Sequence, residues 1–212
     1  MKAMPAVLTT SQLVLKRGFD ILFSTIGLCA LGWLIILAYL LATIDTRKNG
    51  IFSQERIGKD GIPFRVFKIR SMLDVDGLST VVTTKKDRRI TALGSFWRRT
   101  KIDELPQLWN VLSGSMSLVG PRPDVPGFAD KLVGEDRVIL AIRPGITGPA
   151  ALKFRNEEEI LALQHDPESY NRTVIYPEKV RLNREYIENY TFVNDIHYIL
   201  QTILGSPKRG PR

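Results

Sequence analysis

An uncharged apolar segment near the N-terminus most limits how this chain can fold. Residues 21–44, ILFSTIGLCALGWLIILAYLLATI, contain no charged side chain. An α-helix needs roughly 20 apolar residues to cross the hydrocarbon core of a bilayer, and core helices of soluble proteins rarely extend this far without a charge. A cleaved signal peptide fits poorly, because its apolar region usually has about 7–15 residues and ends at small residues. The segment therefore predicts a membrane-inserted helix.

Basic residues on both sides of the segment bear on how the helix enters the membrane. Positions 16–17 and 47–48 each carry a lysine and an arginine, so the positive-inside rule favours neither orientation. A helix that enters and returns keeps both pairs on one face, which favours a re-entrant helix over residues 16–48. A simple span with weak orientation signals is the alternative. Asp20 is expected near the lipid headgroups.

Composition limits the class of protein and of partner. The chain has 212 residues, 44% of them apolar and 25% charged, which is typical of a folded domain with one core. A single cysteine, Cys29, excludes a disulfide framework, and the two histidines, His165 and His197, lack a metal-binding pattern. The net charge of +8 favours an anionic partner, which leaves nucleic acid, phospholipid and phosphorylated substrates open.

The rest of the chain predicts an α/β fold that is mainly helical, with a small β-hairpin. The hairpin is expected from runs at 51–57 and 64–72 around Lys59-Asp60-Gly61, followed by a polar loop over 74–87. Helical patterns cover 90–99, 105–112, 124–133, 157–163 and 177–190. We divide the chain into an N-terminal extension (1–15), the re-entrant helix (16–48), a cytoplasmic catalytic domain (49–205) and a basic tail (206–212).

The last predicted helix has one apolar side. Its apolar residues recur at spacings of three and four: Phe192, Ile196, Ile199, Leu200, Ile203 and Leu204. This pattern favours core packing over a helix that lies flat in the membrane interface. Trp33, Trp97 and Trp109 could each mark a membrane interface, although we expect Trp109 to pack in the core.

The densest group of chemically active residues lies in 98–123, RRTKIDELPQLWNVLSGSMSLVGPRP. Pro106 is tolerated only in a first helical turn, so a helix is expected to begin near Asp103, with Asp103 as its N-cap and Glu104 in its first turn. Ordinary capping is one interpretation. The other is a phosphate site, because Arg98 and Lys101 lie close by in sequence and paired carboxylates with substrate phosphates suit Mg²⁺.

Restrained arginines follow this segment. Arg122 lies between Pro121 and Pro123, and Arg143 begins a second such element, RPGITG. Guanidinium groups on stiff turns suit bidentate contact with phosphate or stacking on a base, although tight turns with solvated arginines explain them equally well. Lys68, on the second predicted strand, is a weaker candidate for phosphate binding.

These residues resemble the bacterial sugar transferases, specifically the small monotopic phosphoglycosyl transferases that begin glycan assembly on a polyprenol phosphate. The resemblance covers nearly the whole chain and is carried by five motifs: KRGFD, FSQERIGKDGIPFRVFKIRSM, RRTKIDELPQLWNVLSGSMSLVGPRP, RPGITG and REYIENY. The family's Asp-Glu dyad matches Asp103 and Glu104, and its phosphate-binding arginine matches Arg98. Its nucleotide-associated Pro-Arg-Pro element matches 121–123, and we assign Arg143 to the nucleotide as well.

The resemblance implies a two-step reaction at the cytoplasmic face of the bacterial inner membrane. Asp103 would attack the sugar-bearing phosphorus of a UDP-sugar and release UMP, and undecaprenyl phosphate would then accept the phosphosugar. Glu104, with Asp103, would bind Mg²⁺. The extension before the apolar helix is too short for the extra helices of larger relatives, so the resemblance implies the minimal catalytic unit. A homodimer is one assembly that the sequence leaves open.

The sequence departs from the family pattern at two places. Many members break the membrane helix with a Ser-Pro pair, where this chain has Gly32-Trp33. After RPGITG many continue with Trp-Ala-Gln, where this chain has residues 149–157, which bear on sugar choice. Two other classes of function stay open at this point. A non-catalytic module that binds anionic lipid or scaffolds glycan export explains the charge and the helix, whereas a nucleic-acid binder lacks any fingerprint and ranks last.

Overall fold

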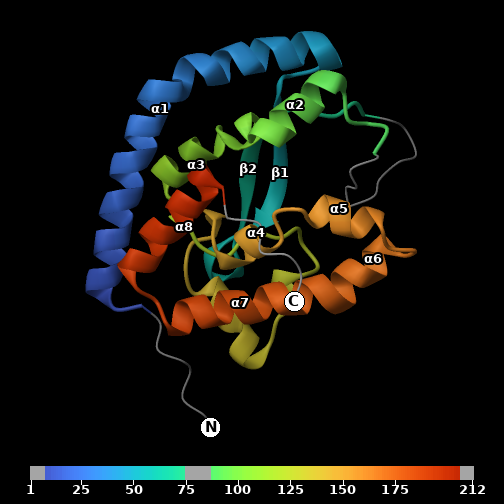
Figure 1. Ribbon diagram of the computed structural model, residues 1–212. Coiled ribbons are helices and arrows are strands. Elements are labelled where there is room, and N and C mark those ends of the chain that lie inside the picture. The colour runs from blue at the N-terminus through green and yellow to red at the C-terminus, as the bar shows by residue number, and fades with distance from the viewer. Residues whose placement is uncertain (1–7, 75–86, 206–212) are drawn as a thin grey trace.

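One helix, α1 (Thr10–Thr46), carries the whole apolar segment. The computed structural model describes residues 8–74 and 87–205. α1 continues without a break through Gly32 and Trp33, but it bends, running along one side of the molecule and then across its top (Figure 1). The hydroxyl groups of Ser24 and Thr25 donate to main-chain carbonyls one turn earlier, at 2.6 and 2.8 Å, a contact that bends helices. The helix therefore curves without a proline.

Both ends of α1 pack on the rest of the protein. Its buried residues recur at every fourth position in two groups: Lys16, Asp20 and Ser24, then Ala38, Ala42 and Thr46. No residue of the stretch between them, 25–37, is buried. By length and composition, α1 is the only helix in the described part of the chain that could cross a membrane. Its two ends thus lie on one body, and its apolar middle contains no buried residue.

Polar side chains fasten the first half of α1. Arg17 donates to the carbonyls of Val111 and Leu112 at 2.7 and 2.9 Å, and Asp20 accepts a hydrogen bond from the main chain of Leu118 at 2.9 Å. Asp20 is only 2% exposed, so its side chain is buried in the protein, and its depth relative to the lipid headgroups stays a prediction. It is buried because it satisfies a main-chain donor that no strand partner reaches.

A buried polar network joins α1 to the two C-terminal helices, α7 (Tyr176–Glu188) and α8 (Phe192–Leu204). Lys16 Nζ lies 2.6 Å from Asp195 Oδ2. The same carboxylate accepts from the hydroxyl groups of Tyr186 at 2.6 Å and Tyr190 at 3.2 Å. The lysine of KRGFD therefore neutralises a carboxylate inside the protein instead of facing lipid headgroups.

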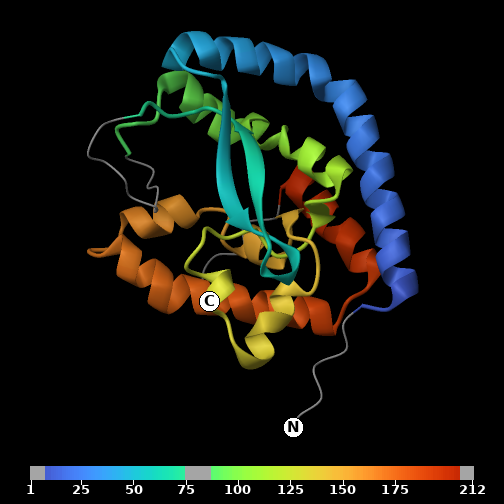
Figure 2. The ribbon, with the colours of Figure 1, turned by 180° about the vertical axis from the view of Figure 1, so that it is seen from behind.

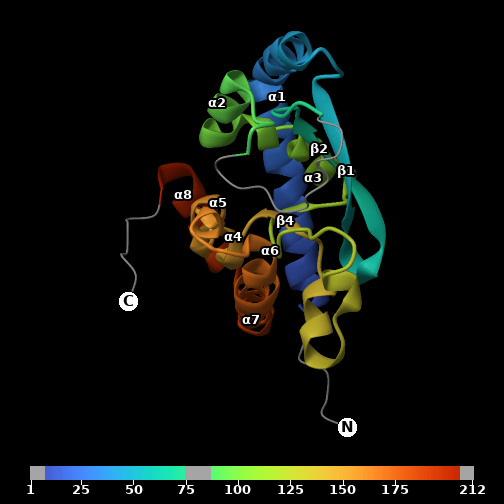
Figure 3. The same ribbon diagram turned by 90° about the vertical axis from the view of Figure 1, so that its right-hand side faces the viewer.

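The expected hairpin is confirmed. β1 (Ile51–Ile57) pairs antiparallel with β2 (Pro63–Ile69), and Ile51 lies opposite Ile69. The turn between them is left-handed at Asp60 (φ 59°) and Gly61 (φ 79°), conformations that suit these residue types. Figure 2 shows the hairpin on the side turned from the viewer in Figure 1, and Figure 3 places it across the molecule from α7.

Four predicted helices are confirmed, and one prediction is wrong. The confirmed helices are α2 (Ala92–Thr100), α3 (Gln107–Ser113), α5 (Glu157–Ala162) and α7. Residues 124–133 form a loop whose only helical part is a 3₁₀ turn, Ala129–Lys131. Pro126 and Gly127, which has a φ of 99°, interrupt any longer helix there. Of the expected loop over 74–87, residues 75–86 lie outside the described residues, as do 1–7 and the basic tail.

Several short elements had no clear sequence signal. They are α4 (Pro149–Lys153), α6 (Pro167–Tyr170), a π-helical turn (Asn171–Ile175), a 3₁₀ helix (Gly134–Leu140), and two strands, β3 (Ser117–Val119) and β4 (Gly145–Thr147). The two strands form a parallel pair. The main core lies around α7 and the 3₁₀ helix and includes Val119, Val138, Ile139, Val180 and Ile187.

The apolar face of α8 packs in the core only in part. Ile199 packs against the main core one turn after the buried Asp195, and Phe192 packs on Phe19 of α1. Leu200, Ile203 and Leu204 are 48%, 73% and 79% exposed. The expectation for Trp109 is also wrong, since this side chain is exposed on α3, whereas Trp97 is buried. Exposed apolar side chains therefore lie on α1, α3 and α8.

Candidate active site

The Asp103-Glu104 pair lies at a sharp change of direction between two helices. α2 ends at Thr100, Lys101 adopts a left-handed conformation (φ 61°), and a 3₁₀ turn, Ile102–Glu104, follows. The next helix begins after Pro106, so Asp103 is not its N-cap, and this prediction is wrong. The carboxylate of Asp103 is thereby free of a capping contact.

Glu104 is held by two cations. Its Oε1 lies 2.5 Å from Arg122 Nη2 and 3.4 Å from Lys68 Nζ. Burial alone would raise the pKa of Glu104, but the positive charges of Arg122, Lys68 and Lys101 outweigh it and hold the pKa well below its usual range. Glu104 is therefore ionised, and its negative charge in turn raises the pKa of Arg122.

Asp103 differs from its neighbour. It is only 6% exposed, and its Oδ1 has no hydrogen-bond partner among the described residues. Burial, reinforced by the negative charge of Glu104, raises the pKa of Asp103 above its ordinary value of 3.8. A buried carboxylate oxygen without a donor is costly to keep and is common where a ligand or reaction uses it.

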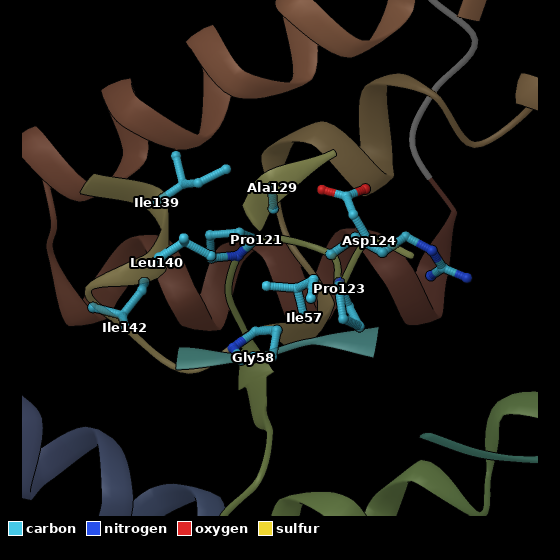
Figure 4. Close-up of a pocket in the computed structure, with 11 residues that line it drawn as sticks. Ile57, Gly58, Pro121, Pro123, Asp124, Ala129, Ile139, Leu140 and Ile142 are labelled. Atoms are coloured by element: carbon cyan, nitrogen blue, oxygen red, sulfur yellow. The ribbon is translucent and has the colours of Figure 1, made fainter. Parts of the chain in front are cut away.

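Close glycine contacts position the Pro-Arg-Pro element. A Cβ at Gly145 would lie 2.1 Å from the nitrogen of Gly120, and one at Gly148 would lie 2.5 Å from its carbonyl oxygen. These glycines let β3 and β4 approach each other, and Pro121 to Pro123 leave the end of β3. The element lines a cavity of about 10 Å³, whose other walls are mostly apolar (Figure 4). A space of this size holds one water at most, so no substrate enters it.

The structure brings most predicted site residues together. Lys68 and Arg122 contact Glu104, and the charge of Arg98 acts on Asp103. Arg98 also forms an ion pair with Glu158, at the start of α5. Arg143 is placed elsewhere, since its Nε donates to the carbonyl of Gly114 at the C-terminal end of α3, at 2.7 Å.

Sequence reasoning missed polar residues beside Arg122. Arg56, at the end of β1, has a pKa lowered to about 10 by burial and by the charge of Arg122. Burial and the charge of Glu157 raise the pKa of Asp124 to about 6, although Lys179 and Arg56 oppose the shift. The available signals were the arginine within QERIG and the acid directly after Pro121-Arg122-Pro123.

The dyad is the place where a divalent cation fits. The described residues bring together no set of three or more His, Cys, Asp and Glu side chains. Mg²⁺, however, commonly takes only one or two carboxylates, with substrate phosphates and water as its other ligands. The unpartnered Oδ1 of Asp103 beside Glu104 fits that smaller donor set.

Comparisons with known proteins identify the family of this chain. Residues 11–208 match the model of the bacterial sugar transferases. An exopolysaccharide production protein of Rhizobium leguminosarum bv. phaseoli is 36% identical over 94% of this chain and 98% of its own length. A Bacillus subtilis protein, provisionally named an undecaprenyl-phosphate N-acetylgalactosaminyl 1-phosphate transferase, is 45% identical over 60% of this chain and 72% of its own.

Some relatives are much longer. The UDP-glucose:undecaprenyl-phosphate glucose-1-phosphate transferase of Escherichia coli is 33% identical over 90% of this chain, which covers 39% of that protein. The range that matches the family model, 11–208, includes the dyad and the Pro-Arg-Pro element. The chain therefore belongs to the bacterial sugar transferase family and is an enzyme of the phosphoglycosyl transferase class.

Proposed function

We propose that the protein transfers a phosphosugar from a UDP-sugar to undecaprenyl phosphate and releases UMP. This would be the first membrane step in assembling a bacterial glycan such as a capsule, O-antigen, exopolysaccharide or glycoprotein. The names of relatives that act with undecaprenyl phosphate support this class of substrates. The observation that carries the proposal is the buried, unpartnered oxygen of Asp103 beside a cation-bound Glu104.

The reaction that we propose has two balanced displacements. An Asp103 carboxylate oxygen attacks the sugar-bearing phosphorus, the bond from that phosphorus to the bridging oxygen breaks, and UMP leaves with the electron pair. A phosphate oxygen of undecaprenyl phosphate then attacks the same phosphorus and expels Asp103. The carboxylate is thus restored, and the product is an undecaprenyl diphosphate sugar.

Cationic side chains would stabilise the charge that develops on the phosphates. Arg122 and Lys68 already neutralise Glu104, and Arg98 can exchange its Glu158 partner for a phosphate oxygen. Asp103 and Glu104 would hold Mg²⁺, which, when bound, offsets the negative charge of the diphosphate. The role of Arg143 in nucleotide binding stays a prediction.

We further propose that α1 enters the inner membrane from its cytoplasmic face and returns. Both ends of α1 are buried against one body, whereas no residue between 25 and 37 is buried. A helix that crossed the bilayer would separate its ends by the roughly 30 Å hydrocarbon core, so that one body could not contact both from the same side. The exposed apolar residues of α3 and α8 would then lie at the interface.

The raised pKa of Asp103 predicts how the rate depends on pH. Attack requires the ionised carboxylate, so the single-turnover rate of UMP release at donor concentrations far below saturation, which reports the free enzyme, should fall about tenfold per pH unit below that raised pKa. Glu104, whose pKa is held low, stays ionised over the same range. A rate that stays flat down to pH 3.8 would contradict Asp103 as the attacking group.

UMP release tests the proposed function. The full-length protein in detergent, with Mg²⁺, undecaprenyl phosphate and a panel of UDP-sugars, should release UMP and form a lipid-linked sugar with at least one donor. Binding to anionic vesicles without UMP release from any donor would instead favour a non-catalytic membrane module. Omission of undecaprenyl phosphate should limit release to one UMP per protein molecule, as a covalent intermediate requires.

A further inference from the structure

Gln107 is a buried polar side chain with an unused hydrogen-bond donor. It is the first residue of α3 and is only 3% exposed. Its side-chain nitrogen, Nε2, has no acceptor among the described residues. Most buried polar atoms in folded proteins have a partner, because an unpaired buried donor is costly. The reaction proposed above does not use this group.

Gln107 lies on the same buried face as Asp103. The 3₁₀ turn that contains Asp103 leads into α3, and the backbone stays in the right-handed helical region through Leu105 and Pro106. Side chains four residues apart on such a path have Cβ atoms roughly 5–6 Å apart. The buried residues of this stretch recur at spacings of three and four: Asp103, Pro106, Gln107, Asn110 and Val111.

Strand β2 holds this face in place on both sides of Gln107. On one side, Asn110 Oδ1 accepts a hydrogen bond from the main chain of Phe67 at 3.1 Å. On the other, Lys68 Nζ, from the next residue of β2, lies 3.4 Å from Glu104 Oε1. Gln107 lies between these two contacts along the chain, so its backbone is fixed relative to the dyad.

The two amide side chains of this face differ in what they do for the fold. Asn110 uses both ends of its amide on β2, because its Nδ2 also donates to the carbonyl of Arg65 at 2.8 Å. Gln107 Nε2 makes no such contact within the described part of the chain. Support of the hairpin therefore explains Asn110 and leaves the donor of Gln107 without a structural role.

The unpartnered atoms of Asp103 and Gln107 are of opposite kinds. Asp103 Oδ1 is an acceptor without a donor, and Gln107 Nε2 is a donor without an acceptor. A phosphoryl group matches both, because its phosphorus accepts the attacking oxygen while its non-bridging oxygens accept hydrogen bonds. A neutral amide also suits this position, since a cation there would pair with Asp103 and weaken it as a nucleophile.

We propose that Gln107 is a catalytic residue whose Nε2 donates a hydrogen bond to a non-bridging oxygen of the phosphorus that Asp103 attacks. This inference rests on the proposed function, because it requires a sugar-bearing phosphate at the dyad. Negative charge builds up on the non-bridging oxygens during attack, so the hydrogen bond is stronger in the transition state than in the ground state. The amide keeps both of its protons, so the bonds that form and break stay as described above.

Both displacements take place at the same phosphorus, so one hydrogen bond assists both. Gln107→Met, which keeps the length of the side chain and removes the donor, should slow UMP release and the transfer to undecaprenyl phosphate by about 10²-fold each. The two steps are measured separately with the full-length protein in detergent. UMP release is followed with donor alone, and transfer is followed after the loaded protein has been separated from free donor.

Donor affinity and stability separate a catalytic role from other roles. In the Asp103→Asn protein, which should not turn over, added Gln107→Met should change calorimetric UDP-sugar affinity by no more than about threefold, because the lost bond matters in the transition state. The urea midpoint of unfolding should not fall, since the change removes a buried donor that has no partner. Asn110→Leu, in contrast, should lower that midpoint, because it removes both contacts with β2.

A second glutamine provides the matched control. Gln164 Nε2 donates to the carbonyl of Ile160 at 3.2 Å, at the end of α5, and Gln164→Met should keep wild-type rates in both steps. Gln107→Leu is a second removal of the donor if Gln107→Met unfolds at lower urea.

The outcomes distinguish this inference from the proposed function. Wild-type rates of both steps in the folded Gln107 variants would overturn the inference alone, provided that the wild type releases UMP. Weaker UDP-sugar binding with unchanged rates of both steps would also overturn it, because Gln107 would then act only in ground-state binding. Absence of UMP release from the wild type with every donor would refute the proposed function, and the inference with it.

Discussion

Asp103→Asn is expected to lower the rate of phosphosugar transfer by about 10³-fold or more. The amide keeps the size and shape of the side chain, but its oxygen is a far weaker nucleophile than a carboxylate. The pKa of Asp103 is raised by burial and by Glu104, so the neutral amide should fit the folded protein at least as well. The measurement is UMP release and formation of the lipid-linked sugar by the purified protein in detergent.

A second carboxylate provides the control for this substitution. Asp60→Asn makes the same change in the hairpin turn, where asparagine also tolerates the left-handed backbone (φ 59°), and it should keep wild-type rates. Mass spectrometry of the wild type mixed with donor alone should detect one added phosphosugar on the peptide that contains Asp103. Transfer within tenfold of wild type in folded Asp103→Asn would refute the covalent step.

Lys16→Met is expected to destabilise the protein by about 3–5 kcal/mol, the cost of leaving a buried charge without its partner. Lys16 and Asp195 have side-chain exposures of 7% and 3%, so water cannot replace the lost ammonium group. Only the hydroxyl groups of Tyr186 and Tyr190 would still donate to Asp195. The midpoint of unfolding in detergent, followed by circular dichroism in urea, measures the effect.

An exposed ion pair gives the matched comparison. Lys48→Met breaks the ion pair between Lys48 and Asp74, in which each side chain is 55% exposed. It should lower the free energy of unfolding by about 0–1 kcal/mol. Combining Lys16→Met with Asp195→Asn should cost less than the sum of the two single changes, because the buried charges are removed together. Equal unfolding midpoints for Lys16→Met and Lys48→Met would show that the buried pair stabilises the protein no more than the exposed pair does.

Local patterns predicted the elements whose signals lie within a few residues. The hairpin followed from two strand-like runs around Asp60-Gly61, and α2, α3, α5 and α7 from helical patterns. The strands β3 and β4 gave no such signal, because each has three residues and forms only by pairing with a distant segment through close glycine contacts. Chain length and residue type alone do not reveal such a pairing.

Periodicity also did not determine how far along a helix its apolar face stays covered. The apolar series of α8 predicted core packing, and Ile199 does pack against the main core beside the buried Asp195, but Leu200, Ile203 and Leu204 are exposed. The candidate site was easier to anticipate, because the dyad, Arg98 and Arg122 lie within one stretch of sequence. Asp124 and Arg56 were missed because their importance comes from burial next to Arg122, which only the folded arrangement creates.

The buried Lys16–Asp195 pair also orders events during synthesis on the ribosome. Its two members are 179 residues apart, so at roughly 5–20 residues per second the aspartate emerges on the order of 10 s or more after the lysine. Throughout that interval the start of α1 carries a lysine whose final partner has not yet been translated. A nascent chain that stops before residue 195 lacks the carboxylate that Lys16 pairs with, so the start of α1 cannot form its buried ion pair.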